Sequence, residues 1–184
     1  DLLSKHYVFQ SMLSDPRLLE QARVRASSVP PGTEPAARDV MDVFSRRICP
    51  GVRFSLSTNP GVVFGLPMPR WLVAVMTVGA IVVVGAFFAS TDRRARWTHA
   101  ALALILAGAL GNLYDRIFSE VRVPGFAPIH RQVRDFIDCA ELYWVWRFNV
   151  ADALLVVGVG ILVVQRVVPA LLRRRAEAKT KGAG

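Results

Sequence analysis

The chain has 184 residues, 53% of them hydrophobic, and its 23 lysines and arginines outnumber 14 acidic residues, which gives a formal net charge of +9. The apolar residues are gathered in blocks, which excludes an ordinary soluble domain. No apolar stretch lies at the N-terminus, which excludes a secretory signal peptide there. Nucleic-acid binding is the rival interpretation of the basic charge, but no stacking aromatic residues interleave with the basic tail, so it is not favoured.

The first part of the chain, residues 1–70, contains no stretch long and apolar enough to span a membrane. Residues 1–9 are expected to be the polar end of a helix whose apolar part would precede residue 1. Prolines interrupt the region that follows. There we expect two short helices, over residues 18–26 and 36–48, lying at the membrane interface.

A short stretch of sheet is predicted before the first apolar block. Residues 52–57 alternate between apolar and polar side chains, which is typical of a strand with one buried face. Asn59, Pro60 and Gly61 then predict a turn, because proline fixes φ and glycine accepts the positive φ of a type II turn. Residues 62–65 are the predicted returning strand, so we expect a small sheet here.

Three apolar blocks predict membrane-spanning helices. They cover residues 71–89, 98–111 and 149–168. About 20 residues at a rise of 1.5 Å cross the roughly 30 Å hydrocarbon core, and the second block reaches this length if its helix continues through Tyr114. A buried helix of a soluble protein is the alternative for the second block, whereas the first and third have no polar face at any helical period. A ridge of small residues on the second span, at Ala103, Ala107 and Gly111, would let another helix approach closely.

Basic residues flank the same ends of these spans. They are Arg93, Arg94 and Arg96 in the first connection, and Arg166, Arg173, Arg174, Arg175, Lys179 and Lys181 near or after the end of the third span. By the positive-inside rule both clusters are cytoplasmic, so residues 1–70 and 113–148 lie together on the outer side. We therefore divide the chain into an outer segment 1–70, a transmembrane core 71–168 with its outer loop 113–148, and a cytoplasmic basic tail 169–184. The tail is expected to be disordered after Arg173.

Aromatic residues and both cysteines lie on the predicted outer side. The run from Tyr143 to Phe148 directly precedes the third span. We interpret it as an aromatic belt at the level of the lipid headgroups, in preference to a ligand platform. Cys49 and Cys139 could pair in an oxidising compartment, but two free thiols are the favoured expectation.

Polar residues also cluster at the outer ends of the second and third spans, where charge is costly. Asn112, Asp115 and Arg116 share one helix face, because residues at i, i+3 and i+4 are neighbours. Asn149 is the expected N-cap of the third span, and Asp152 lies in its first turn.

Each acid has an ordinary structural explanation. Asp152 could simply stabilise the N-terminus of its helix, Asp115 could pair with an arginine, and Asp135, in the loop between the two spans, could be a solvated charge. Because all three are expected at one membrane face, we favour a functional site.

The residue types limit the chemistry of such a site. A metal centre is not expected, because His99 lies on the opposite side and His6 and His130 have no paired spacing. Ser4 and Lys5 are adjacent but share no helix face, so they do not make a serine–lysine dyad. An aspartic pair remains, in which two carboxyl groups share a proton, one activating water and the other donating a proton.

The proton of such a pair can be assigned as a hypothesis. The helix dipole should keep Asp152 the more readily ionised member, which leaves Asp135 as the acid. A neutron structure with the proton on Asp152 would contradict this assignment.

The motifs resemble those of the lipoprotein signal peptidases, the signal peptidase II family of bacteria. The matching segments, in chain order, are Asp1-Leu2-Leu3-Ser4-Lys5, Asn59-Pro60-Gly61-Val62-Val63-Phe64-Gly65, Asn112-Leu113-Tyr114-Asp115-Arg116, Val133-Arg134-Asp135-Phe136 and Phe148-Asn149-Val150-Ala151-Asp152. Each motif is weak alone, but five motifs in the same order over residues 1 to about 168 make the resemblance specific.

The resemblance implies a fold and a set of residue roles. The fold class would be an all-α membrane protein, a transmembrane helix bundle with three of the family's four spans, a small periplasmic β-cradle and an interfacial helix. Asp135 and Asp152 would be the catalytic pair. The other implied residues are a polar shell of Asn59, Asn112, Arg116 and Asn149, a structural support of Asp1, Lys5 and Asp115, and Gly61 and Phe64 in the β-cradle.

The implied activity is that of an intramembrane aspartic endopeptidase. Such an enzyme removes the signal peptide of a prolipoprotein by cutting before its diacylglyceryl-modified cysteine. The resemblance implies prolipoprotein substrates and membrane lipids as partners, no cofactor, no metal, no nucleic acid and a monomer. It also implies a multi-pass location in the bacterial inner membrane, with the active site facing the periplasm.

The sequence departs from the family pattern in two ways. The first spanning helix is absent, because the chain begins at the motif that would end it. The stretches from Lys5 to Asn59 and from Arg116 to Asp135 are longer than expected, which affects the geometry of a lid and of substrate entry.

Two other functions remain open. A non-catalytic membrane adaptor with the family fold would fit the missing helix and the two insertions, whereas both aspartates and their asparagines favour an enzyme. A small channel or transporter subunit would use Asp115 and Asp152 as ion sites, but the spans carry no charge in mid-membrane.

Overall fold

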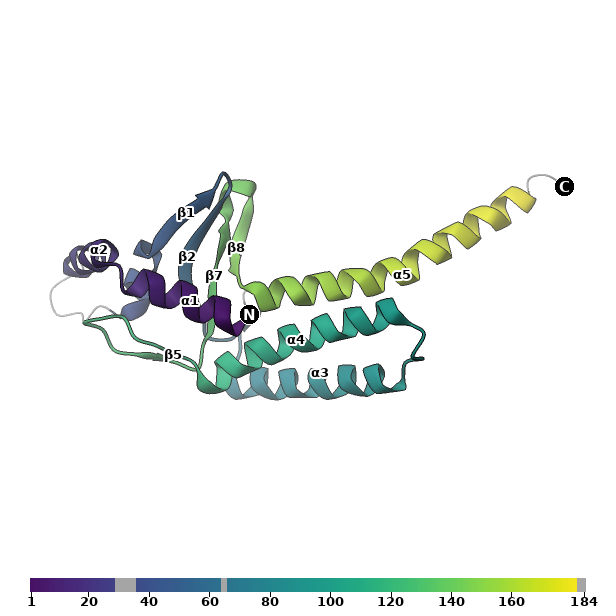
Figure 1. The fold of residues 1–184 in the computed structure, drawn as a ribbon, viewed down its shortest axis with the longest axis horizontal. Helices are drawn as coiled ribbons and strands as arrows, with labels where there is room; N and C mark the ends of the chain where they lie inside the picture. Colours follow the sequence, from purple (N-terminus) through teal and green to yellow (C-terminus); the bar gives the residue numbers. More distant parts are fainter. Residues whose placement is uncertain (29–35, 64–65, 182–184) are drawn as a thin grey trace.

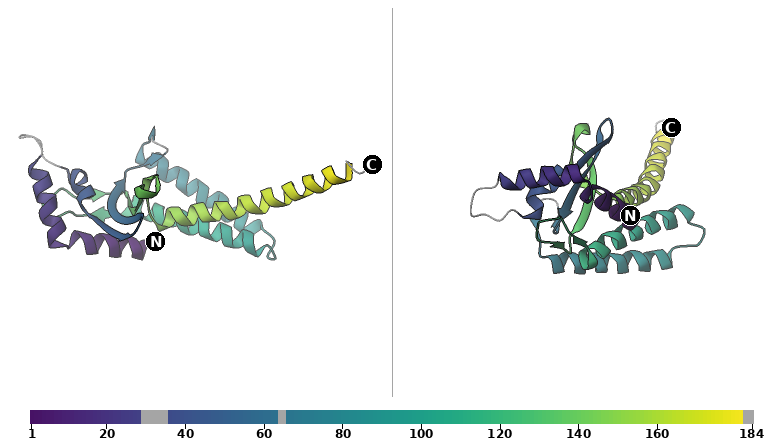
Figure 2. Two further views of the ribbon diagram at one scale, coloured as in Figure 1. Left: turned by 90° about the horizontal axis from the view of Figure 1, so that it is seen from above. Right: turned by 60° about the vertical axis from the view of Figure 1, so that its left-hand side comes forward.

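Three long helices lie side by side, and a β-sheet stands across one end of them (Figure 1). The computed structural model describes residues 1–28, 36–63 and 66–181. The chain begins where the helices meet the sheet, and the last helix runs from there to the opposite end of the molecule, as two further views also show (Figure 2). We call the end of the helices that carries the sheet the sheet end.

The three predicted spans are α3 (Arg70–Ser90), α4 (Arg96–Phe118) and α5 (Val150–Lys181). Each contains a stretch long and apolar enough to cross a membrane, with mean hydropathies of 2.6, 1.4 and 2.0. Helix α4 continues through Tyr114, as expected, and so reaches spanning length. The disorder predicted after Arg173 is wrong for the described residues, because α5 stays helical to Lys181. Alanine, arginine, glutamate and lysine, which dominate this tail, are among the strongest helix formers.

Helices α4 and α5 approach closely through glycines. At Gly108 a β-carbon would collide with the backbone of α5, and at Gly158 it would lie 2.7 Å from the carbonyl oxygen of Ala101. The predicted ridge is therefore misplaced on α4, since Ala103 and Ala107 are exposed. Their spacing was right for a ridge, but spacing does not tell which side of a helix faces its neighbour.

The sheet has four antiparallel strands in the order β1-β2-β7-β8. Their bounds are Ser45–Cys49, Val52–Asn59, Val133–Cys139 and Trp144–Phe148, and the 3-10 turn η2 (Ala140–Leu142) joins the last two. Cys49 and Cys139 are free, as expected. The predicted helix bundle is confirmed, but the all-α class is too narrow, because the stretch before the third span supplies two further strands.

Three short helical elements precede the sheet. They are α1 (Leu2–Leu13), α2 (Pro16–Ser27) and the 3-10 helix η1 (Ala37–Val43). The helix expected over residues 18–26 is α2, whose first turn is capped by the side chain of Asp15. The helix expected over residues 36–48 is only partly right, because η1 ends at Val43 and β1 follows. The apolar residues there suit either period, and pairing with β2 makes the second half a strand.

The expected turn after β2 is present, but the returning strand pairs elsewhere. Gly61 has a φ of +118°, and its N–H donates a hydrogen bond to Asn59 Oδ1 at 2.9 Å. Strand β3 (Val62–Val63) pairs with β4 (Leu66–Pro67) and not with β2. Phe64 and Gly65, the rest of the predicted strand, lie outside the described residues.

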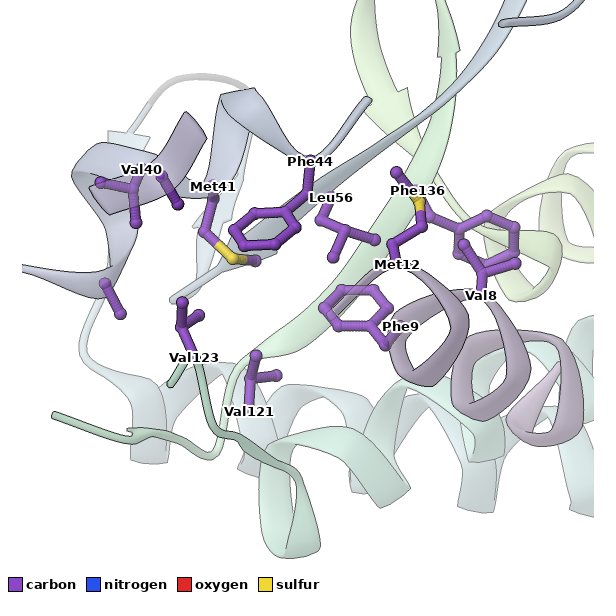
Figure 3. Packing of buried hydrophobic residues seen from close by; sticks show 12 residues of the cluster. Val8, Phe9, Met12, Val40, Met41, Phe44, Leu56, Val121, Val123 and Phe136 are labelled. Carbon is purple, nitrogen blue, oxygen red and sulfur yellow. The ribbon is translucent and has the colours of Figure 1, made fainter. Parts of the chain in front are cut away.

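A hydrophobic core joins the N-terminal helices to the sheet (Figure 3). Its buried residues are Val8, Phe9, Met12, Ala22, Ala37, Val40, Met41, Phe44, Leu56, Val121, Val123 and Phe136. Both longer-than-expected stretches contribute to it, the second through β5 (Glu120–Val121), which pairs with β6 (Ile129–His130). Phe136 also packs edge-to-face on Phe54, with ring centroids 5.4 Å apart. These two stretches therefore support β7, the strand that carries Asp135.

Candidate active site

Polar side chains from four elements meet at the sheet end. They are Asp135 on β7, Asn112 and Asp115 on α4, Lys5 on α1, and Asn149 and Asp152 at the start of α5. Five of these six side chains belong to residues less than a tenth exposed, and Asp152 is half-buried. Buried polar groups need hydrogen-bond partners, so the contacts among them define the site.

Asp135 lies in a strand and not in the loop that the sequence predicts. It pairs across the sheet with Ser57 of β2, is only 6% exposed, and accepts a hydrogen bond on Oδ1 from Asn149 Nδ2 at 2.7 Å. The adjacent charged residues Arg134 and Asp135 hide this strand, since a half-buried strand normally alternates apolar with polar residues.

Asp152 caps its own helix. The Asn149 N–H donates to Asp152 Oδ2 at 3.1 Å, and the Asp152 N–H donates to Asn149 Oδ1 at 3.2 Å. This reciprocal pair is a capping box, so Asn149 is the expected N-cap. The other carboxylate oxygen, Oδ1, accepts a hydrogen bond from Asn112 Nδ2 at 2.7 Å. Asp152 thus stabilises the helix and also belongs to the polar cluster.

Two asparagine side chains connect the two acids. Asn149 Nδ2 donates to Asp135 Oδ1 at 2.7 Å and to Asn112 Oδ1 at 3.2 Å, and Asn112 in turn donates to Asp152. Asp135 and Asp152 are therefore joined through hydrogen-bonded amides, although they lie on different elements.

The orientation of both amides follows from groups that can only donate. The backbone N–H of Asp152 holds Asn149 Oδ1, which turns the NH₂ group of Asn149 toward Asp135. The Lys5 ammonium donates to Asn112 Oδ1 at 3.0 Å, which turns the NH₂ group of Asn112 toward Asp152. Each aspartate therefore meets an N–H donor and not a carbonyl oxygen.

Lys5 is fully buried and its ammonium meets three acceptors. Besides Asn112, it contacts Asp1 Oδ2 at 2.7 Å and Asp115 Oδ2 at 3.1 Å. Three acceptors match the three N–H donors of an ammonium group. Burial lowers the pKa of Lys5, and the charge of Asp115 opposes that effect. The other oxygen of Asp1 accepts the backbone N–H of Ala151 at 3.0 Å, so this cluster also fixes the start of α5.

Asp115 pairs with Arg134 of β7 and not with its helix neighbour Arg116. Arg134 donates to Asp115 Oδ1 from Nη2 at 2.7 Å and from Nε at 3.1 Å, and its backbone N–H donates to Oδ2 at 3.0 Å. Sequence reasoning missed Arg134. The only available signal was an arginine beside a candidate acid, and spacing cannot pair residues on a strand and a helix.

Arg116 instead lies near the acids of the polar cluster. Its half-buried guanidinium interacts electrostatically most strongly with Asp152, and then with Asp135 and Asp115. Within the described part of the chain, its buried Nε has no hydrogen-bond partner. The site therefore contains a cationic donor next to two acids.

Asn59 and Gly61 lie at the edge of the cluster. Asn59 ends β2 and pairs with Val133, two residues before Asp135. Its side chain accepts the N–H of Gly61, so it shapes the turn that follows.

Burial makes Asp135 an unusually weak acid. The pKa of Asp135 is raised to about 7, first by burial and then by the nearby charge of Asp152, with a small contribution from Asp115. The hydrogen bond from Asn149 and the charge of Lys5 oppose this shift. Near neutral pH, Asp135 therefore holds its proton in a large fraction of molecules, which agrees with its predicted role as the acid.

No metal centre is formed by the described residues, because no three histidine, cysteine, aspartate or glutamate side chains gather there. The two linked carboxyl groups are suited to acid–base work instead. One can hold a proton near neutral pH while the other accepts hydrogen bonds as a carboxylate.

The raised pKa predicts a pH-dependent stability. Below pH 4 Asp135 is protonated in both the folded and the unfolded chain, but between about pH 4 and 7 only the folded chain keeps the proton. The free energy of unfolding should therefore fall as the pH rises through this window and level off above it, by about 1.4 kcal/mol per unit of pKa shift at most.

Thermal unfolding from pH 4 to 8 measures this effect. Asp135→Asn should remove most of the slope, and Asp42→Asn, at an exposed position, should follow the wild type. An Asp135→Asn variant with the full wild-type slope would show that another group is responsible.

Comparisons with known proteins agree with these motifs. The family model for signal peptidase (SPase) II matches residues 1–168. A lipoprotein signal peptidase of Rhodococcus jostii is 38% identical over 114 residues, which cover 61% of this chain and 52% of that protein. The lipoprotein signal peptidase of Pseudomonas putida is 35% identical, covering 59% and 61%, and that of Desulfitobacterium hafniense is 37% identical, covering 67% and 71%. The chain thus spans about half to three fifths of the length of the first two relatives.

Solved structures share the fold. A bacterial membrane enzyme aligns with a TM-score of 0.56 and 21% identity, over 95% of this chain and 90% of the other. A second bacterial membrane enzyme aligns with a TM-score of 0.54 and 20% identity, over 89% and 92%. At this identity the likeness concerns the fold alone.

Proposed function

Since the chain belongs to the signal peptidase II family, we propose that it is an aspartic endopeptidase that removes the signal peptide from prolipoproteins. The substrate is a prolipoprotein whose cysteine carries a diacylglyceryl group, and the cut falls directly before that cysteine. The observation that carries the proposal is the amide bridge of Asn112 and Asn149, which joins Asp135 to Asp152.

The two acids take different roles in this proposal. Asp152 is the general base, because both of its oxygens accept hydrogen bonds, from Asn112 and from the backbone of Asn149. Asp135 is the general acid, because its pKa of about 7 lets it hold a proton at neutral pH. Since Asn149 donates to Oδ1 of Asp135, the proton belongs on Oδ2.

The reaction then proceeds in two steps. Asp152 takes a proton from a water molecule, whose oxygen attacks the scissile carbonyl carbon, while Asp135 gives its proton to the carbonyl oxygen. The tetrahedral intermediate collapses with cleavage of the C–N bond, and the amine that leaves receives the proton held by Asp152. The proton returned from the intermediate's hydroxyl to Asp135 restores the starting state.

Other polar groups of the cluster position the substrate. Arg116 is the proposed donor to a carbonyl of the substrate backbone, supported by its Nε near the acids, to which no described residue is hydrogen-bonded. Asn59 and Gly61 shape the neighbouring turn, and Asn112 and Asn149 orient the acids. Asp1, Lys5 and Asp115 support this arrangement as one buried ion cluster.

The orientation in the membrane follows from charge. The basic residues at the far ends of α3, α4 and α5 favour a cytoplasmic location for those ends, which puts the sheet end in the periplasm of a bacterial inner membrane. Asp152 lies one turn inside α5, a depth of about 5 Å, which suits a bond at the outer edge of the bilayer. Exposed Tyr143, Trp144 and Trp146 before α5 suit the level of the lipid headgroups. The proposal further includes membrane lipids as partners and a monomeric protein.

The proposal is tested with the full chain reconstituted in liposomes. It should cut a diacylglyceryl-modified precursor directly before the cysteine, and it should leave uncut the same precursor with that cysteine replaced by serine. Mass spectrometry of the products locates the cut. A folded protein that binds the lipidated precursor without cutting it would instead support the adaptor function.

A further inference from the structure

Asp135 lies where the pairing of β7 with its neighbours changes: residues 133–135 pair with β2, and the register shifts directly after Asp135. The pairing of β7 with β8 is recorded at Ile137 and Cys139, beyond Asp135, so on that side the ladder starts two residues later. On the other side β2 pairs with β7, but the register shifts between Phe54 and Ser57, next to the partner of Asp135. A register shift locally disrupts a ladder. This part of β7 is therefore held by the sheet on one side, by β2, and its pairing with β8 begins only at Ile137.

Arg134 supplies a second attachment of this part of β7, to helix α4. Its side chain donates two hydrogen bonds to Asp115 Oδ1, at 2.7 and 3.1 Å, and its backbone N–H donates a third to Oδ2 at 3.0 Å. We call these three bonds the Asp115–Arg134 clamp. The Asp115 side chain is fully buried and that of Arg134 is 12% exposed, so water competes little for these bonds.

The clamp fastens β7 to the helix that also holds the other acid. Asn112, one turn before Asp115 on α4, donates to Asp152 at 2.7 Å. Asn112 and Asp115 lie on one face of α4. Through Asn112 the helix binds Asp152 directly, and through Asp115 it binds Arg134, the neighbour of Asp135. The separation of the two acids therefore depends in part on their contacts with this one helix.

We propose that Arg134 is a positioning residue for this active site: its forked hydrogen bonds to Asp115 hold β7 on α4 and so keep Asp135 within working distance of Asp152. The inference rests on the proposed function, since it assigns a role in that same reaction. Arg134 does not touch the reacting atoms.

Removing the charge of Arg134 should also affect Asp135, through the charge of Asp115. The other charged groups around Asp135 are Asp152 on α5, Lys5 on α1, and Asp115 and Arg116 on α4. Without Arg134, the negative charge of Asp115 is balanced by Lys5 alone, which raises the pKa of Asp135 further. The alkaline side of the pH–rate profile then moves to higher pH.

The test compares three variants of the full chain in liposomes. Arg134→Met should lower kcat by about 10- to 100-fold with little change in KM, because a small displacement of a catalytic group has this effect. Arg134→Lys should recover part of the loss, since it keeps the charge but not the fork. Arg122→Met is the matched control, because Arg122 is an exposed arginine of a neighbouring segment whose ion pair, among the described residues, is the local one with Glu120. Its kcat should equal that of the wild type.

Two further readouts separate positioning from a merely structural role and from failure of the proposed function. The infrared band of the protonated Asp135 carboxyl, assigned with Asp135→Asn, should titrate at higher pH in Arg134→Met than in the wild type, whether or not the protein cuts prolipoproteins. An unchanged titration overturns the inference, as does a wild-type kcat per folded molecule in Arg134→Met. A folded wild type that cuts nothing overturns the proposed function alone.

Discussion

Replacing either acid by its amide should reduce kcat by about 10³-fold or more, since each variant removes one proton-transfer step. In Asp152→Asn the side chain can no longer take a proton from water. It also has one oxygen in place of two, so it keeps the hydrogen bond from Asn149 N–H or the one from Asn112, but not both. In Asp135→Asn the amide can donate a hydrogen bond but cannot release a proton to the substrate.

The measurement is kcat for a lipidated precursor at pH 6 to 7. The control is Asp138→Asn, because Asp138 lies on the same strand and is buried to a similar degree, with 7% exposure against 6% for Asp135. It pairs with Arg53 and Arg147 at the far end of β7, so its loss should cost less than about 10-fold per folded molecule. Normal turnover in either variant of the pair would exclude the aspartic mechanism.

Replacing Lys5 by methionine should destabilise the protein by about 3–5 kcal/mol, the typical cost of leaving buried charge without its partner. Asp1 would lose the only ion pair that the described residues give it, and Asp115 would keep Arg134 alone. Asn112 would lose the donor that fixes its amide, so kcat should also fall. Chemical denaturation in detergent micelles measures the first effect.

A double variant isolates the charge. Asp1→Asn keeps an oxygen to accept the N–H of Ala151 but removes the carboxylate that Lys5 neutralises. The double variant Lys5→Met with Asp1→Asn should therefore be more stable than Lys5→Met alone. Equal loss of stability in both would mean that Lys5 acts through packing of its aliphatic chain and not through its charge.

Features that depend on neighbouring residues were predictable from the sequence. The three spans follow from the length of apolar runs, and the capping of α5 follows from Asn149 and Asp152 three residues apart. The turn at Gly61 follows from the need for a positive φ. Each of these is decided within a few residues, where backbone sterics and hydrogen bonding act directly.

Features that depend on residues far apart in the sequence could not be predicted from it. β7 is a strand because β2 and β8 pair with it, and residues 133–139 carry charges where an isolated strand would alternate apolar with polar. Arg134 reaches Asp115 across 19 positions and Asn112 reaches Asp152 across 40. The orientation of the Asn112 amide depends on Lys5, more than 100 positions away. No pattern within a window of sequence contains these pairs.

The capping box at the start of α5 fixes the position of Asp152 along that helix. Helix α5 begins two residues before Asp152, so the depth of the Asp152 carboxylate along the helix is set by helical rise and not by the length of any loop. A change of length in residues 10–58 or 117–132 would therefore leave the depth of Asp152 unchanged. Moving the cut along a substrate would require adding or removing residues in α5 itself.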